Sequence, residues 1–147
     1  MRSGPMARRP KRQLHYKRHL QTQKTDHCAF CDIVQNKHED IIAVTDHCAI
    51  INNPYGYDLW DECGVEQHWL LIPRRHIVSL GELTQDEQLD YMQQVGHFAD
   101  KGYSLYARAP GNVTGSVAHQ HMHLIKIDNQ RKNFLFYLRK PHMVVMK

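Results

Sequence analysis

The stretch that decides the fold is His119-Gln120-His121-Met122-His123-Leu124-Ile125, in which three histidines alternate with other residues before an apolar pair. If this stretch is extended, the three imidazoles project from one face of a strand, because side chains alternate between faces. Neighbouring imidazoles are then about 6.5 to 7 Å apart. Each buried imidazole needs polar partners for two nitrogens, so the row favours a functional site over a plain core.

Two chemistries use such a row of imidazoles. A metal site brings neutral imidazoles together on one ion. Phosphoryl or nucleotidyl transfer uses one imidazole as nucleophile and the others to bind phosphate oxygens. The outer two histidines of a strand would be about 13 to 14 Å apart, which disfavours one shared ion. The preceding segment, residues 111–116 (Gly-Asn-Val-Thr-Gly-Ser), is either a plain turn or an anion cradle of amides and hydroxyls.

The charge of the chain is divided unevenly along its 147 residues. Residues 1–25 hold eight Lys and Arg side chains and no acid, which leaves 11 bases against 15 acids in residues 26–147. We predict a basic, disordered arm over residues 1–25 and one folded domain over residues 26–147. The arm is a solvated terminus, a weak nucleic-acid or partner contact, or a targeting segment.

Composition excludes several classes of protein. No apolar run is long enough to span a membrane. Four cysteines in a chain of this length do not make a disulfide scaffold, and the arm lacks the apolar core of a secretory signal. Free cysteines favour the cytoplasm, with the mitochondrion as the alternative that the arginine-rich arm leaves open.

The order of apolar runs, with strands before and after one long helix, predicts an α+β domain. Thr84 and Glu87 form a capping box that starts the long helix, and apolar residues continue at helical spacing to Tyr103 or Tyr106. Residues 52–64 are predicted as a loop. Strands are predicted at residues 41–44, 48–51, 69–72, 116–127 and 133–138.

Two cysteines form a CxxC motif, Cys28-Ala29-Phe30-Cys31. This motif binds zinc, forms a redox pair, or provides two small buried residues. A redox pair belongs between a strand and a helix of a βαβ unit, whereas this motif directly follows the arm. From spacing alone, His76 and His119 are candidates for two further zinc ligands.

Taken together, these segments resemble the histidine triad family of nucleotide-binding hydrolases and transferases. Residues 119–125 fit its alternating histidines, and residues 116–118 fit the segment that enters them. Residues 68–76 (His-Trp-Leu-Leu-Ile-Pro-Arg-Arg-His) and residues 49–52 (Ala-Ile-Ile-Asn) resemble two of its strands. Residues 28–34 resemble its zinc-carrying branch. The resemblance covers about two-thirds of the chain, and it implies an antiparallel sheet with one long helix and a short one.

The resemblance implies a reaction at the α-phosphate of a nucleotide conjugate, such as a phosphoramidate or a dinucleoside polyphosphate of adenosine or guanosine. His121 would form a nucleotidyl-histidine intermediate. His123 and Ser116, with Asn112, would bind the phosphate or leaving group, and His68 would bind or relay a proton.

The resemblance also implies binding residues, a cofactor and an assembly. Asn52 would hold the ribose, and Ile33 and Ile50 would line the base pocket. A structural zinc ion would be bound by four ligands, and the protein would be a homodimer. These ligands are Cys28, Cys31, His76 and His119.

This chain departs from the family pattern in places. Gln120 replaces an apolar residue between two histidines, and Lys126-Ile127-Asp128 follows where Pro-Arg is common. The loop over residues 53–67 is long, and it either covers the nucleotide or is a surface insertion. Two other functions remain as alternatives: a nucleotide- or nucleic-acid-binding module with little catalysis, and a metal-dependent hydrolase.

Overall fold

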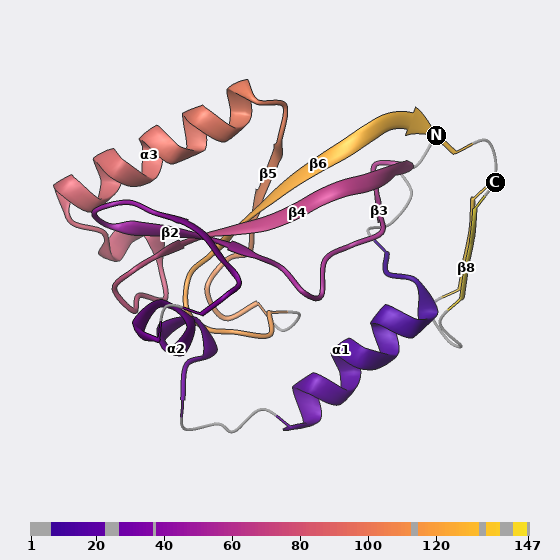
Figure 1. The fold of residues 1–147 in the computed structure, drawn as a ribbon, viewed down its shortest axis with the longest axis horizontal. Coiled ribbons are helices and arrows are strands. Elements are labelled where there is room, and N and C mark those ends of the chain that lie inside the picture. Colours follow the sequence, from indigo (N-terminus) through magenta and orange to yellow (C-terminus); the bar gives the residue numbers. More distant parts are fainter. Residues whose placement is uncertain are drawn as a thin grey trace. The chain divides into compact units, whose positions relative to one another are not determined.

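The computed structural model describes residues 7–22, 27–36, 38–112, 115–132, 135–138 and 143–146. The helices are α1 (Pro10–Thr22), α2 (Ala29–Gln35) and α3 (Gln85–Asp100), with a 3-10 turn η1 (Leu80–Glu82) (Figure 1). The strands are β1 (Ile41–Val44), β2 (Cys48–Asn52), β3 (Leu59–Trp60), β4 (Cys63–Pro73), β5 (Ser104–Ala107), β6 (Met122–Arg131), β7 (Leu135–Leu138) and β8 (Met143–Met146).

The strands form an antiparallel α+β fold, which confirms the predicted fold class. Strand order in the main sheet is β1-β2-β4-β6-β5, with β3 paired to β4, and β7 pairs with β8 in a separate hairpin. The predicted hairpin over residues 41–51 is β1 and β2. None of the helices in the described ranges has the length and apolar character that a bilayer crossing requires.

Internal contacts divide the chain into two compact units. We call residues Lys24–Asn53 and Trp69–Leu124 the triad unit, and residues Met1–Gln23, Pro54–His68 and Ile125–Lys147 the arm unit. Strands β4 and β6 each continue from one unit into the other. The boundary predicted at residue 25 stays a prediction.

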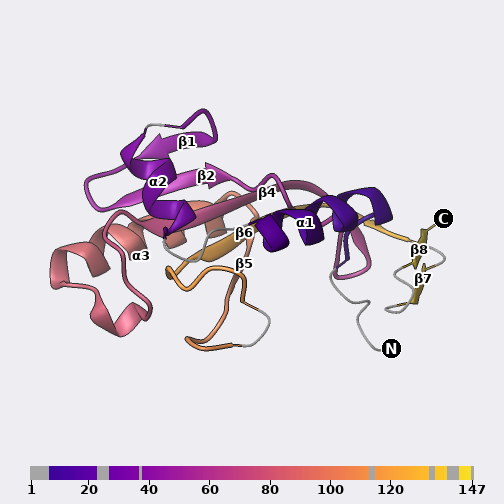
Figure 2. The same cartoon turned by 90° about the horizontal axis from the view of Figure 1, so that it is seen from below.

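The sheet of the triad unit is covered on both faces (Figures 1 and 2). Cys48 and Ile50 of β2 pack with the aromatic rings of α3, whereas Ala49 and Ile51 pack with Phe30 of α2. In β4, Leu71 joins the first cluster, and Leu70 and Ile72 join the second. Two covered faces explain why the sequence of these strands is a continuous apolar run rather than an alternating one.

Helix α3 begins as the sequence predicts and ends earlier. Thr84 caps it, and the capping box with Glu87 is present. Gly102 has a φ of +81°. Its N–H donates to the carbonyl of Ala99 at 2.9 Å, and the N–H of Tyr103 donates to the carbonyl of Phe98 at 3.0 Å. This Schellman motif stops the helix. The prediction that the helix includes Tyr103 or Tyr106 is therefore wrong, and Tyr106 lies in β5.

The arm unit contains a helix where disorder is predicted. Residues 10–22 form α1, which begins with proline at its first position, where a missing N–H costs nothing. Asp58 accepts the backbone N–H of Arg9 at 2.7 Å and pairs with Arg12 at 2.8 Å. A carboxylate at this end of a helix also complements the helix dipole. Local helix propensity and one carboxylate thus oppose the charge repulsion that favours disorder.

The predicted loop over residues 52–64 contains a hairpin in the arm unit. Trp60 pairs with Cys63, and the two turn residues between them, Asp61 and Glu62, have φ values of 49° and 65°. Two positive φ values are typical of a type I′ turn. The usual Asn-Gly signal is missing from this turn, so the sequence gives little warning of it.

Arg75 and Glu87 form a two-point ion pair in the triad unit. Nε and one terminal nitrogen of Arg75 donate to the two oxygens of Glu87 at 2.8 and 2.7 Å. These hydrogen bonds, with that from the N–H of Thr84, lower the pKa of Glu87 to about 2. The pair ties the segment after β4 to the first turn of α3.

We predict that Glu87→Gln lowers the free energy of unfolding by about 1 to 3 kcal/mol at pH 7, because charge-assisted hydrogen bonds are lost. Because the pKa of Glu87 in the folded protein is lower than its ordinary value of 4.5, ionisation of Glu87 stabilises the fold at pH values above about 4.5. The difference between wild type and variant should shrink as pH falls from about 4.5 towards 2. Urea unfolding across this range measures it. A difference that is constant with pH would contradict the prediction.

Candidate functional site

The three triad histidines all lie in the triad unit, but only His123 is in a strand. Strand β6 starts at Met122, so the prediction of a strand over residues 116–127 is wrong for residues 116–121. The N–H of Gln120 donates to the carbonyl of Ile77 at 2.7 Å, which bends this segment away from a ladder. His119 is fully buried and His123 is nearly so, whereas His121 is partly exposed.

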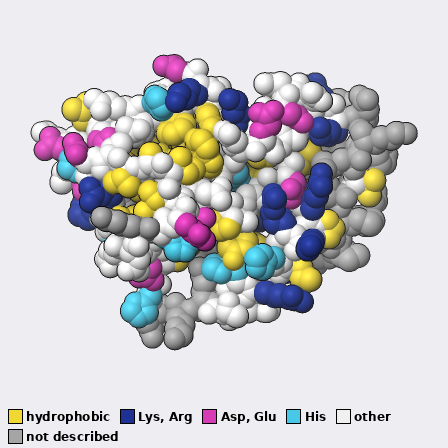
Figure 3. All heavy atoms as spheres, viewed as in Figure 1, with side chains coloured by type: hydrophobic (Ala, Val, Ile, Leu, Met, Phe, Trp, Pro, Cys, Tyr) yellow, Lys and Arg dark blue, Asp and Glu magenta, His cyan; other side chains and the backbone are white. Residues whose placement is uncertain are grey.

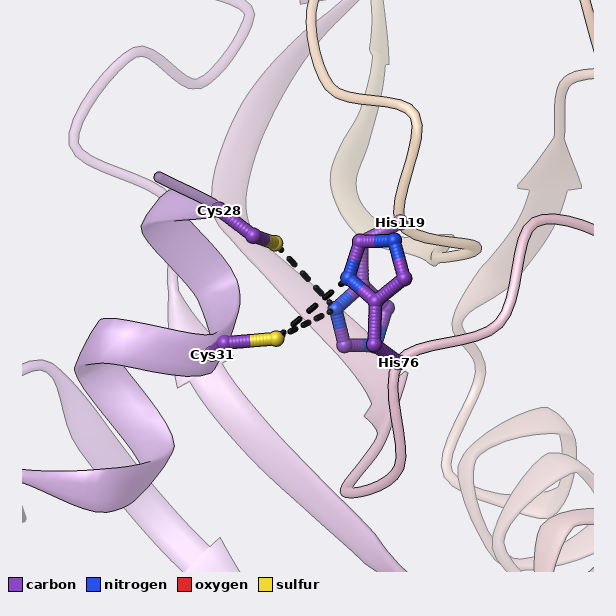
Figure 4. Close-up of side chains that lie close together, drawn as sticks. All are labelled: Cys28, Cys31, His76 and His119. Atoms are coloured by element: carbon purple, nitrogen blue, oxygen red, sulfur yellow. Dashed lines mark hydrogen bonds between the residues drawn. The ribbon is translucent and has the colours of Figure 1, made fainter. Parts of the chain in front are cut away.

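Four potential metal ligands meet where α2 begins (Figure 4). The ligand atoms of Cys28, Cys31, His76 and His119 all lie within 4.8 Å of one another. Cys28 Sγ is 3.4 Å and Cys31 Sγ is 3.5 Å from His119 Nδ1, and Cys31 Sγ is 3.3 Å from His76 Nδ1. These four residues can hold a metal ion.

The separation and chemistry of these atoms fit a tetrahedral site. Zinc bonds of 2.0 to 2.3 Å place neighbouring ligand atoms about 3.3 to 3.8 Å apart, and two thiolates with two imidazoles are a common zinc donor set. The sulfur–nitrogen distances of 3.3 to 3.5 Å lie within this range. Burial and the adjacent Cys28 raise the pKa of Cys31 to about 11, so metal binding would have to displace a proton.

His119 is oriented by a second contact. Its Nε2 lies 2.9 Å from the carbonyl of Pro73, and since a carbonyl only accepts, Nε2 carries the hydrogen. The lone pair is then on Nδ1, which faces the cysteines. Metal-binding histidines commonly donate their other N–H in this way.

His121 is oriented by the backbone of His119. Its Nδ1 lies 2.9 Å from the His119 carbonyl, so Nδ1 donates and the lone pair is on Nε2. Burial lowers the pKa of His121, and the nearby Arg108 lowers it further. The ring of Phe30 packs edge-on against it, with centroids 5.1 Å apart. His121 is therefore a neutral imidazole with a fixed tautomer and an available lone pair at pH 7.

A cavity of about 270 Å³ adjoins His121. Asn112 and Ser116, both predicted as phosphate-binding residues, line it, and so does Arg108. Gly111 has a φ of +71°, and the N–H of Gly115 donates to the carbonyl of Asn112 at 2.8 Å, so backbone turns bring these polar groups together. The lining residues that the structure describes provide one cationic side chain, Arg108, and several hydrogen-bond donors, so the cavity is suited to an anionic ligand.

Two residues of this site are missed by the sequence analysis. Tyr106 stacks on His123 with ring centroids 5.4 Å apart, and the guanidinium of Arg108 lies 5.2 Å from the Tyr106 ring centre. Tyr106 lies in β5 and Arg108 comes directly after it, whereas the sequence analysis assigns this segment to the preceding helix. The Lys101-Gly102 pair is the sequence signal that could have ended that helix earlier.

The predicted nucleotide-binding residues are less closely grouped. Ile33 packs with the α2-side cluster, whereas Ile50 is enclosed in the α3-side cluster on the other face of β2. The structure therefore does not bring Ile33 and Ile50 to one pocket, because neighbouring positions of a strand face opposite ways. Asn52 is exposed at the end of β2, where its N–H donates to the carbonyl of Asp40 at 2.7 Å.

His68 belongs to the arm unit. It is buried, and its Nδ1 accepts the backbone N–H of Tyr57 at 2.9 Å. The Tyr57 ring also packs against it at 4.8 Å between centroids. This bond fixes the tautomer of a neutral His68, with its hydrogen on Nε2.

Residues 27–134 match a family model described as scavenger mRNA decapping enzyme C-term binding. The chain belongs to the scavenger mRNA decapping enzyme C-terminal family. This match spans both the cysteine pair and the histidine triad. No curated protein sequence matches the chain.

Solved structures share the fold of this scavenger decapping family member at low sequence identity. A HIT family hydrolase from Legionella pneumophila Philadelphia 1 is 17% identical with a TM-score of 0.51, covering 74% of this chain and 97% of its own. One from Clostridium thermocellum is 21% identical with a TM-score of 0.51, covering 76% and 100%. A HIT family protein from Bacillus subtilis is 21% identical with a TM-score of 0.56, covering 71% and 76%. The fold is that of histidine triad proteins.

Proposed function

We propose that this protein is a nucleotide hydrolase or transferase that cleaves a nucleotide conjugate at the α-phosphate through a nucleotidyl-histidine intermediate on His121. The observation that carries the proposal is the hydrogen bond from His121 Nδ1 to the His119 carbonyl, which leaves Nε2 unprotonated on an imidazole that lines a cavity with Arg108 and Ser116. The names of the family and of the solved structures support the same class of reaction.

The reaction begins with attack of His121 Nε2 on the α-phosphorus. A nitrogen–phosphorus bond forms, the bond to the leaving group breaks, and the leaving group departs with its electron pair and takes up a proton. The imidazolium that results keeps its Nδ1 hydrogen bond to the His119 carbonyl, 2.9 Å away, which stabilises the positive charge. Water then attacks the phosphorus and loses a proton to the solvent, the nitrogen–phosphorus bond breaks with its electron pair returning to Nε2, and the nucleoside monophosphate leaves a neutral His121.

The cavity supplies groups for the phosphate. Arg108 offers a planar cation to the non-bridging oxygens, and Ser116 and Asn112 offer hydrogen-bond donors. His123, 5.1 Å from His121 between ring centroids, binds the phosphate or protonates the leaving group. In the same proposal His68 relays a proton or binds substrate, Asn52 holds the ribose, and Ile33 contacts the base.

We propose that the conjugate is a phosphoramidate or a dinucleoside polyphosphate of adenosine or guanosine, and that the protein acts as a homodimer. The family description adds the mRNA cap dinucleotide, itself a dinucleoside triphosphate, to the compounds worth testing. A panel of these compounds, followed by release of nucleoside monophosphate, ranks the leaving groups. Sedimentation velocity tests the dimer.

We propose that the ion held by Cys28, Cys31, His76 and His119 is zinc and that its role is structural. Four protein ligands leave no coordination position for substrate. Zinc supplies a fixed link between α2, the segment after β4, and the triad segment. Both ring nitrogens of His119 are engaged away from His121, which argues against a catalytic ion shared by the three triad histidines.

We predict that His121→Ala lowers the release of nucleoside monophosphate by about a thousandfold or more, because the nucleophile is lost. His97→Ala is the matched control, since His97 is exposed on α3 and does not line the cavity. Mass spectrometry of wild type with an adenosine phosphoramidate should show a mass gain of one AMP that His121→Ala lacks. Near wild-type turnover by a folded His121→Ala protein would refute the proposed nucleophile.

We predict that Cys31→Ser loses bound zinc and lowers the free energy of unfolding by about 3 kcal/mol or more, because ligand binding to the folded state adds to stability. Elemental analysis gives zinc per chain, and thermal unfolding with and without a chelator gives the stability. His97→Ala should keep both. A Cys31→Ser protein with one zinc per chain would rule out this ligand set.

A further inference from the structure

Helix α1 of the arm unit presents an unusual surface. It has no buried residue and no acid, and it carries Lys11, Arg12, Lys17 and Arg18 together with two histidines. Figure 3 shows Lys and Arg side chains gathered over the region of α1. With these cations and no acid among its 13 residues, α1 forms none of the oppositely charged pairs three or four residues apart that stabilise helices.

Part of this surface lines a cavity of about 640 Å³ within the arm unit. Its cations are Arg9, Lys11, Arg12 and Arg18, and its less polar wall consists of Leu14, Pro54 and the His15 ring. Ligand-binding pockets are typically about 300 to 1,000 Å³, so this cavity is large enough for a nucleotide.

One carboxylate lines the cavity, and it is already paired. Asp58 binds Arg12 at 2.8 Å and the backbone N–H of Arg9 at 2.7 Å. Across the ranges that the structure describes, the side chains of Arg9, Lys11 and Arg18 form no ion pair. Three cations thus face the cavity without a neutralising partner among these residues.

We propose that this cavity binds the phosphodiester backbone of a single-stranded polynucleotide, RNA or DNA, with a base against Leu14, His15 and Pro54. Arginine matches phosphate geometry with paired hydrogen bonds, and two of the three unpaired cations are arginines. Single-strand sites combine a cationic track with surfaces that contact base faces, which a duplex hides. This inference stands apart from the proposed hydrolase activity.

A membrane surface would use the same charges differently. An interfacial helix lays a continuous apolar face on the bilayer. Leu14 and Leu20 are 51% and 39% exposed, but they are six positions apart, so they point about 120° apart around α1 and form no continuous apolar face. The hollow between α1 and the loop at Pro54 fits a chain better than a plane.

The test is fluorescence anisotropy of the full chain with labelled RNA and DNA single strands of about 12 nucleotides, within the length range of single-strand sites. If three phosphates are neutralised, the affinity should fall about 18-fold between about 50 and 200 mM salt. A duplex of the same sequence should bind more weakly. Binding to RNA, to DNA or to both supports the proposal, because the two share the phosphodiester backbone. The preference between them identifies which polynucleotide the cavity takes.

The matched variants are Lys11→Glu and Lys17→Glu. Both lysines are exposed on α1, but only Lys11 lines the cavity. Lys11→Glu should weaken binding about tenfold and make the salt slope shallower by about 0.7, while Lys17→Glu should change affinity by about twofold or less. Circular dichroism checks the fold, and hydrolysis of a small nucleotide conjugate should be unchanged in both variants.

Three results would overturn the proposal. One is the absence of binding by wild type at low salt. Another is equal weakening by Lys17→Glu, which would make the effect one of general charge rather than of the cavity. The third is a preference for vesicles of anionic phospholipid over oligonucleotides at equal salt, which would favour the membrane.

Discussion

The two-sided engagement of His119 is the constraint on which the triad unit depends. Its Nε2 donates to the Pro73 carbonyl at 2.9 Å, and its Nδ1 faces Cys28 and Cys31. Its own carbonyl accepts the Nδ1 hydrogen of His121 at 2.9 Å. One buried residue therefore links the end of β4, the ligand cluster and the orientation of the proposed nucleophile. A shift of His119 would be passed directly to His121.

The sheet gives His119 a rigid support. Pro73 pairs with Cys48 at the end of the β2–β4 ladder, and the strands behind it are packed on both faces. Proline has no N–H to place, and its carbonyl is directed to the His119 ring. Burial between two helices thus fixes the backbone atom that sets the tautomer of His119, a potential metal ligand.

The sequence predicts those features of the fold that depend on local chemistry. The hairpin over residues 41–51 and the capping box of α3 are confirmed because neighbouring residues alone determine them. Residues 116–121 are not extended, because the contact of Gln120 with Ile77 is long-range and leaves no local signal. The approach of Cys28 and Cys31 to His76 and His119 agrees with the resemblance, whereas spacing alone left it undetermined. Arg108 is missed because the sequence analysis places the end of α3 too late and so does not recognise β5, which Arg108 follows.

The charge pattern of α1 has an energetic consequence for any ligand that it binds. The contacts that attach α1 to the loop at residues 54–58 are ionic and aromatic, such as Arg12 with Asp58 and His19 stacked on Tyr55 at 4.6 Å. Without a buried apolar face, α1 is held more weakly than α3. A polyanion that binds Lys11 and Arg18, which are two turns apart on one face of α1, would add ionic contacts that require the helix, so binding and helix formation favour each other. A helix that has no buried residue in the free protein would thereby gain stability from the ligand that it binds.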